Sequence, residues 1–140
     1  MLESYEENLD VNSLIKNVMV RRGINRTQTM AYLRSQIPKE GYYQDKIKKA
    51  IKKRYPSAFV AKIAQGAFSQ SGLPDVMTII DGHYFGFEIK RPVFGEPSKV
   101  QLRTIQWIEQ AGGTAAIVTW PEECFKIIER WKAHGKTSEI

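Results

Sequence analysis

The sequence predicts an α/β fold in which a mixed β-sheet is flanked by helices and preceded by a helical extension. Three strand-like apolar segments are followed by a helical pattern, a fourth strand and a last helix. The dipeptide Asp81-Gly82 between the second and third strands is a strong signal for a type I′ hairpin, so these strands should be antiparallel. The helix between the third and fourth strands is a crossover, which should make those two strands parallel through a right-handed connection.

Two short helices are expected at the start of the chain. Residues 11–22 carry apolar side chains at helical spacing and end at Gly23, and residues 26–37 do so up to Pro38. Two helices about a short turn have the form of a helix-turn-helix motif, for which DNA readout is one interpretation. Because this geometry arises easily by chance, packing or dimerisation is the favoured interpretation.

The remaining elements follow a joint at residues 38–41. A third helix is expected over 42–55, with apolar residues on one face and lysines largely on the other. Strands are expected at 58–64, 76–80, 84–90 and 114–119, and helices at 98–111 and 121–133. The chain therefore divides into a helical extension (1–40), one domain (41–133) and a polar, flexible tail (134–140).

Length and charge narrow the class of protein. The 140 residues suit one compact domain, and the net charge is +6. Residues 1–10 include four acidic and no basic residues, so the rest of the chain contains 21 basic and 11 acidic residues. The strongly basic character of residues 11–140 favours a polyanionic partner, and nucleic acid is favoured over an anionic membrane.

The lone cysteine, Cys124, excludes an internal disulfide or a cysteine-based zinc site and suits a reducing compartment. No signal peptide or membrane-spanning run is visible, so a cytoplasmic protein of a bacterial or virus-infected cell, with no membrane partner, is expected.

Candidate chemistry gathers in Ser71-Gly72-Leu73-Pro74-Asp75 and Glu88-Ile89-Lys90. Side chains alternate along a strand, so Glu88 and Lys90 should share one face while Phe87 and Ile89 pack on the other. The hairpin brings the start of one strand beside the end of the next. Asp75 and Glu88 can therefore converge on one point.

Two carboxylates beside a lysine suggest a cation site. Like charges that close repel each other unless a cation intervenes, and Mg²⁺ or Mn²⁺ prefers carboxylate, carbonyl and water oxygens. Such an ion can activate water and polarise a phosphodiester, with Lys90 orienting or deprotonating the water or stabilising charge on the phosphate. The alternative is a surface salt bridge between Glu88 and Lys90.

These motifs resemble those of the PD-(D/E)XK nuclease superfamily, and the following residues are similar to the VRR-NUC family of virus-type replication and repair nucleases. The match spans roughly residues 42–120 and rests on Gly72-x-Pro74-Asp75, Phe87-Glu88-Ile89-Lys90, Arg91-Pro92, Ser98-x-x-Gln101 and Ala111-Gly112-Gly113 before the strand TAAIVT. The resemblance implies a restriction-endonuclease-like fold (αβββαβα), dependence on a divalent metal and phosphodiester hydrolysis. No organic cofactor is expected.

Residue roles follow from that resemblance. Asp75 and Glu88 correspond to metal-binding acids, the Ile89 carbonyl to a further ligand and Lys90 to the catalytic lysine. Gln101 matches a glutamine that positions a ligand or phosphate, with a surface helix residue as the alternative. The family usually carries a glutamate where this chain has Gln44. That departure puts binding of a second metal ion in doubt, and Glu40, one turn earlier on the same helix face, could substitute.

DNA contact is expected from basic residues around these motifs, with an ordinary solvated helix face as the alternative. The predicted nucleic-acid-binding residues are Lys46, Lys49, Lys52, Lys53, Lys62, Ser71, Arg91 and Lys99. His83 and His134 are interpreted as bystanders. Core or dimer packing is expected for Trp107, Trp120 and Trp131.

The favoured functional hypothesis is a structure-specific DNA endonuclease acting as a homodimer on branched DNA such as Holliday junctions. The dimer is implied by the resemblance and because a domain with one site must pair to cut two strands symmetrically. The alternatives are a nicking or restriction-type nuclease and a non-catalytic module that binds DNA or a partner. Gln44 favours the last alternative, whereas Asp75, Glu88 and Lys90 oppose it.

Overall fold

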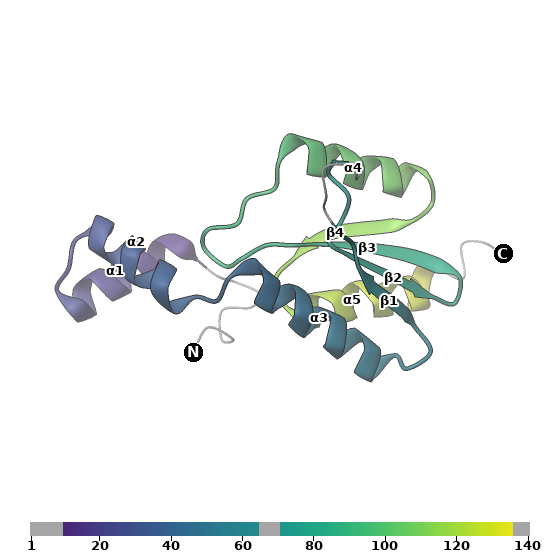
Figure 1. Ribbon diagram of the computed structural model, residues 1–140, viewed down its shortest axis with the longest axis horizontal. Coiled ribbons are helices and arrows are strands. Elements are labelled where there is room, and N and C mark those ends of the chain that lie inside the picture. The colour runs from purple at the N-terminus through teal and green to yellow at the C-terminus, as the bar shows by residue number, and fades with distance from the viewer. Residues whose placement is uncertain (1–9, 65–70, 136–140) are drawn as a thin grey trace.

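A computed structural model describes residues 10–64 and 71–135, which form a four-stranded sheet covered by helices on both faces (Figure 1). The order of the elements is α1 (Val11–Arg22), α2 (Arg26–Gln36), α3 (Glu40–Arg54), β1 (Phe59–Lys62), β2 (Val76–Ile80), β3 (His83–Ile89), α4 (Lys99–Gln110), β4 (Thr114–Val118), α5 (Pro121–Arg130) and a π-helical turn (Trp131–Gly135). No helix in these two ranges has the length and apolar character needed to cross a membrane.

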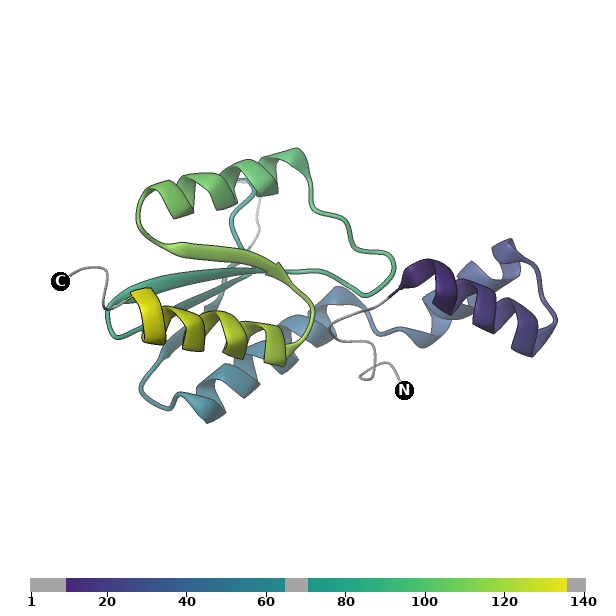
Figure 2. The ribbon, with the colours of Figure 1, turned by 180° about the vertical axis from the view of Figure 1, so that it is seen from behind.

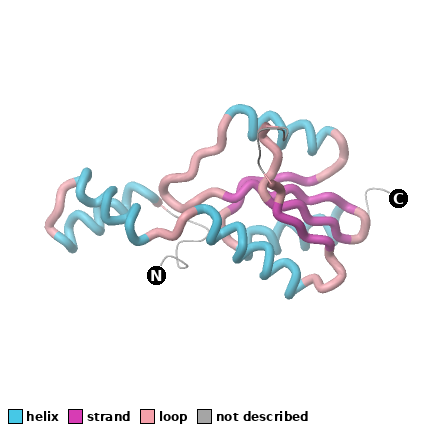
Figure 3. Tube along the Cα trace, in the orientation of Figure 1, coloured by secondary structure: helices cyan, strands magenta, loops and turns pink. Residues whose placement is uncertain are grey.

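The sheet has the strand order β1-β2-β3-β4 (Figure 3). The β1/β2 and β2/β3 pairs are antiparallel and the β3/β4 pair is parallel. Asp81 and Gly82 both have positive φ, at 50° and 80°, which is the backbone of the expected type I′ turn. The predicted mixed sheet with a helical crossover is confirmed.

The sheet packs between two helical layers. Helix α4 lies on one face, and α3 and α5 lie together on the other (Figures 1 and 2). Alternate β3 residues Phe85, Phe87 and Ile89 are fully buried in a core that also holds Tyr43 and Ile47 of α3. Because side chains alternate along a strand, Glu88 is directed to the α4 side.

Several element boundaries differ from expectation. Helix α3 begins at Glu40 rather than at residue 42, since Lys39 is still extended and Glu40 suits the first turn of a helix. The first strand is shorter than predicted, and the third runs one residue earlier, from His83 to Ile89. Helix α5 ends at Arg130, and the π-helical turn includes His134, which had been expected to begin the tail. Residues 136–140 of that predicted tail lie outside the described part.

The two N-terminal helices form an arm, defined here as residues 10–39, that projects from one end of the domain (Figures 1 and 2). Asp10 caps α1, Gly23 ends it in the left-handed conformation, and Asn25 begins α2 through a capping box with Gln28. Leu33 and Ile37 of this segment join the main core. The two helices contact each other, and a role of this pair in dimerisation or DNA readout stays a prediction.

Candidate active site

Asp75 is positioned by two glycines that let its loop approach neighbouring elements. Gly72 has φ +81°, and a Cβ there would lie 2.9 Å from Thr104 Oγ1 of α4. At Gly86 on β3, a Cβ would lie 2.8 Å from Pro74 Cγ. Only glycine permits both approaches, so the Gly-x-Pro-Asp motif and Gly86 together hold Asp75 at the start of β2, beside the end of β3.

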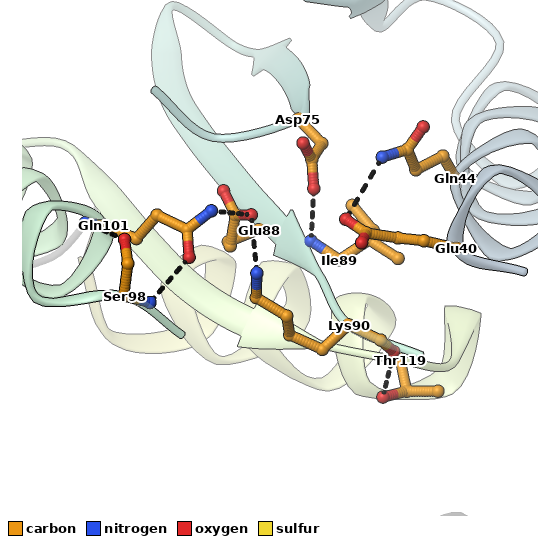
Figure 4. A network of polar contacts seen from close by, with 9 residues as sticks. All are labelled: Glu40, Gln44, Asp75, Glu88, Ile89, Lys90, Ser98, Gln101 and Thr119. Atoms are coloured by element: carbon orange, nitrogen blue, oxygen red, sulfur yellow. Dashed lines mark hydrogen bonds and ion pairs between the residues drawn. The ribbon is translucent and has the colours of Figure 1, made fainter. Parts of the chain in front are cut away.

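Glu88 and Lys90 lie on the same face at the end of β3, as predicted. Glu88 is 1% exposed, and its Oε1 lies 3.3 Å from the Lys90 Nζ. The surface salt bridge considered as an alternative is therefore excluded for this pair. The Lys90 carbonyl accepts a hydrogen bond of 2.8 Å from the Thr119 hydroxyl, which holds the end of β3 beside β4 (Figure 4).

Gln101 serves the site and its own helix at once. Its Oε1 accepts from the Ser98 N–H at 2.9 Å and Ser98 Oγ accepts from the Gln101 N–H at 3.1 Å, which is a capping box at the start of α4. The Nε2 of Gln101 donates to Glu88 Oε1 at 2.7 Å (Figure 4). The alternative of an ordinary surface glutamine does not describe this contact. The pattern Ser-x-x-Gln already carried the capping signal, whereas the bond to Glu88 required the fold.

A third carboxylate joins the predicted pair. Glu40, Asp75 and Glu88 each offer a carboxylate oxygen, and these oxygens lie within 4.8 Å of one another. Gln44 does face this site, and its Nε2 lies 3.4 Å from Glu40 Oε1 (Figure 4). Glu40, named from the sequence as the substitute acid, thus supplies the charge that Gln44 lacks. Gln44 instead donates a long hydrogen bond to it.

Burial and crowding change the acidity of this cluster. Burial and the neighbouring Asp75 charge raise the pKa of Glu88 to about 8, although Lys90 opposes the shift. Burial and Asp75 likewise raise the pKa of Glu40. For both groups, burial and the neighbouring acid outweigh the opposing positive charge of Lys90.

The donor set fits a hard divalent cation. Glu88 Oε2 is buried and has no hydrogen-bond partner among the described residues, so one strong acceptor is left unsatisfied at the centre of the cluster. Three carboxylates offer the all-oxygen environment that Mg²⁺ and Mn²⁺ prefer. Asp75 Oδ2 also accepts the Ile89 N–H at 2.9 Å, which orients this carboxylate (Figure 4). The role of the Ile89 carbonyl as a ligand stays a prediction.

A pocket of about 440 Å³ opens beside the cluster. It is lined by Gln44, Lys62, Ile63, Ala64 and Asp75, so the Asp75 member of the cluster is reachable from outside. Lys62 Nζ lies 3.3 Å from Asp45 Oδ1, and both side chains are largely exposed. Lys62 thus lies at the opening and is paired with Asp45, and its contact with DNA stays a prediction.

The other predicted DNA contacts are dispersed. The Arg91 guanidinium donates to the carbonyls of Arg34, Ile37 and Pro38, at 2.6, 2.6 and 2.9 Å, so its donors hold the end of α2 against the domain. Sequence reasoning missed this role because no local pattern signals it. Lys52 donates to the Ala58 carbonyl at 2.7 Å.

Further predicted DNA contacts differ in exposure. Lys46 lies over the Trp120 ring. Lys49, Lys53, Ser71 and Lys99 are exposed, and their contact with DNA stays a prediction.

The histidines and tryptophans lie away from the acids or in the core. His83 bonds the Thr114 hydroxyl and stacks on Trp131. Trp120 is buried against Tyr43. Trp107 is 54% exposed, so core packing was the wrong expectation for it and dimer packing stays open.

Comparison with known proteins identifies the architecture. No family model matches the chain, and no curated protein matches it. A solved structure described as a VRR_NUC domain is similar at 24% sequence identity and a TM-score of 0.51, over 64% of this chain and 97% of that one. The expected restriction-endonuclease-like architecture is confirmed: this chain has the fold of a VRR_NUC domain.

Proposed function

We propose that this protein is a metal-dependent DNA endonuclease of the VRR-NUC family. The observation that carries the proposal is the convergence of Glu40, Asp75 and Glu88 beside Lys90, with a buried Glu88 oxygen left without a partner. The shared fold supports the same conclusion. A non-catalytic module would not need to keep three mutually repelling acids at one point.

The chain's own groups have distinct tasks in this proposal. Glu40, Asp75 and Glu88 would hold Mg²⁺ or Mn²⁺, with Asp75 fixed by the Ile89 N–H and Glu88 fixed by Gln101. When bound, a divalent ion supplies Lewis-acid polarisation of the phosphodiester.

Lys90 supplies a positive charge next to the acids, 3.3 Å from Glu88 Oε1. There its ammonium can orient the attacking water and stabilise the negative charge that develops on the phosphate oxygens. Because the group is held before the substrate arrives, little reorganisation is needed during the reaction.

DNA is proposed as the substrate because basic side chains lie at the pocket beside Asp75 and on the helix that begins with Glu40. Lys62 borders the pocket, and Lys49 and Lys53 are exposed on α3. Reversing Lys49 and Lys53 to Glu should weaken binding to all DNA substrates alike, since phosphate contacts carry no base information. Lys52 is left unchanged in this variant because its ammonium bonds the Ala58 carbonyl.

A cleavage assay tests the function. Branched and linear duplexes are incubated with the protein in Mg²⁺, in Mn²⁺ and in excess EDTA, alongside Glu88→Gln. We expect internal cuts with either ion, and none in EDTA or with the variant. Cleavage that persists in EDTA, or in the variant at the wild-type rate, would refute the proposed site. Absence of cleavage by the wild-type chain under every condition would refute the function.

We further propose a homodimer that prefers branched DNA such as a Holliday junction. One site per chain requires two chains for paired cuts. Light scattering measures the mass in solution, and junction and linear duplex compared at equal concentration measure the preference. A monomer that nicks one strand of linear duplex would instead support the nicking alternative.

A further inference from the structure

The arm has a large excess of basic over acidic side chains. Residues 10–39 contain six basic side chains and one acidic side chain, Asp10. The bases are Lys16, Arg21, Arg22, Arg26, Arg34 and Lys39, and all six are exposed. This concentration of charge stands at the end of the domain from which the arm projects (Figures 1 and 2). A positive surface of this kind attracts polyanions.

The outer surface of the arm is polar as well as charged. Val20 is its one exposed large hydrophobic residue among positions 10–39, at 82% exposure. The exposed residues of α2 include Thr27, Ala31 and Ser35, which are small or can hydrogen-bond. Protein interfaces usually have an apolar, charge-poor centre. The composition of this surface therefore favours a nucleic-acid backbone over a protein partner.

The arm is attached directly beside the catalytic residues. Arg91, the residue after Lys90, bonds three carbonyls at the end of α2 and the linker that follows. Both Arg34 of the arm and Arg91 stack their guanidinium groups on the Phe94 ring, at 4.7 and 4.8 Å from its centroid. Glu40 of the acidic cluster directly follows the arm. The arm is therefore held at a defined position relative to the site.

We propose that the arm binds the phosphate backbone of the DNA duplex on one side of the cleaved bond. This inference rests on the proposed function and adds a second binding surface to it. The 11 residues of α2 span about 17 Å, and this length corresponds to about five base pairs of duplex. Arg21 and Arg26 flank the turn at the far end of the arm, where their guanidinium groups can each bind a phosphate. Helix α3 runs away from the arm (Figure 1), begins with Glu40 of the acidic cluster and carries Lys49 and Lys53 further along, so Glu40 lies between the basic arm and these lysines along the chain.

The test compares Arg21→Gln/Arg26→Gln with Lys126→Gln/Arg130→Gln. The second pair removes the same charge from α5, toward the end of the molecule opposite the arm (Figure 2). Affinity for a labelled 20-base-pair duplex is measured by fluorescence anisotropy in EDTA across a salt series. The slope of log affinity against log salt is negative, and for the arm variant it should become shallower by about 1.8. This change corresponds to about 60-fold weaker binding at 0.1 M salt. The control pair should change the slope by much less.

Two further measurements distinguish phosphate contact from a structural defect. Arg21→Lys/Arg26→Lys keeps both charges and should retain most of the wild-type slope. At saturating DNA and in Mg²⁺, the Gln variant should cleave at the wild-type rate with a raised KM, because neither arginine contacts the reacting atoms. Trimming the duplex to fewer than about five base pairs on both sides of the cut should remove the difference between wild type and variant.

Three results would overturn the inference. The arm variant could keep the wild-type salt slope, it could lose no more affinity than the α5 control, or it could change the mass in solution and so reveal a subunit interface. The first two results, obtained with a wild-type chain that cleaves DNA, refute the arm surface and leave the proposed function intact. A wild-type chain that binds DNA in EDTA but never cleaves it refutes the function while the salt slopes still decide the arm. A chain that neither binds nor cleaves DNA refutes both.

Discussion

Without metal, the protein should lose stability as the pH rises from 5 to 8. The folded protein holds a proton on Glu88 up to a pKa of about 8, whereas the unfolded chain releases it near the ordinary value of 4.5. Between these values the folded state binds more protons, so the free energy of unfolding decreases with pH. The stabilisation of the folded state by the Glu88 proton is fully present below pH 4.5 and is lost as the pH rises through 8. Glu40, whose pKa is also raised, acts in the same direction.

The magnitude follows from the Glu88 shift. Integrating proton release for one group with a pKa of about 8 folded and 4.5 unfolded gives a loss of about 4 kcal/mol between pH 5 and pH 8. A loss of this size is a large part of the stability of a small domain. Adding Mg²⁺ should flatten the dependence, because an ion that binds only the folded, ionised cluster stabilises it by mass action.

Urea unfolding at pH 5, 6, 7 and 8 in EDTA measures how the free energy of unfolding depends on pH, with Glu88→Gln as the matched variant. The glutamine is neutral at every pH, and its carbonyl can still accept the Gln101 hydrogen bond. The variant should therefore show a much smaller pH dependence, exceed the wild type in stability at pH 8, and lose most of the stabilisation by Mg²⁺.

A wild-type profile in EDTA that is flat or rises between pH 6 and pH 8 would refute this reasoning. So would an equal slope in Glu88→Gln, which would assign the pH dependence to other groups. In either case the carboxyl would be ionised without a cation, and the electrostatic argument for a metal site would fail.

Substitutions at three positions separate the roles within the site. Asp75→Asn should abolish cleavage but keep the acceptor for the Ile89 N–H. Asp75→Ala should also lower the free energy of unfolding in urea by about 1–3 kcal/mol, because it leaves that buried donor unpaired. Equal stability of the two variants would contradict this reasoning. Gln101→Glu keeps the helix cap but replaces a donor by a negative charge beside Glu88, so cleavage should fall at least tenfold with unchanged helix content by circular dichroism. Gln44→Glu adds a fourth acid and should strengthen Mn²⁺ binding in calorimetry; unchanged affinity would place residue 44 outside the ligand set.

The sequence determined by itself the features that depend on local backbone geometry. Alternation along a strand places Glu88 and Lys90 on one face and Phe87 on the other, whatever the rest of the chain does. The Asp81-Gly82 turn then forces the antiparallel hairpin and brings Asp75 to the end of β3. These predictions required only the few residues on either side of each element.

Only the tertiary structure decided which distant groups complete the site. Helical spacing puts Glu40 and Gln44 on one face of α3, but the packing of α3 against the sheet decides which of them meets Asp75 and Glu88. In the same way, the capping motif was visible at Gln101, whereas its bond to Glu88 depends on where α4 crosses the sheet. Arg91 had been assigned to DNA as a basic residue, yet it bonds carbonyls more than 50 residues away. Contacts of this kind depend on the relative placement of whole elements, which is set by core packing and leaves no periodic signal in the chain.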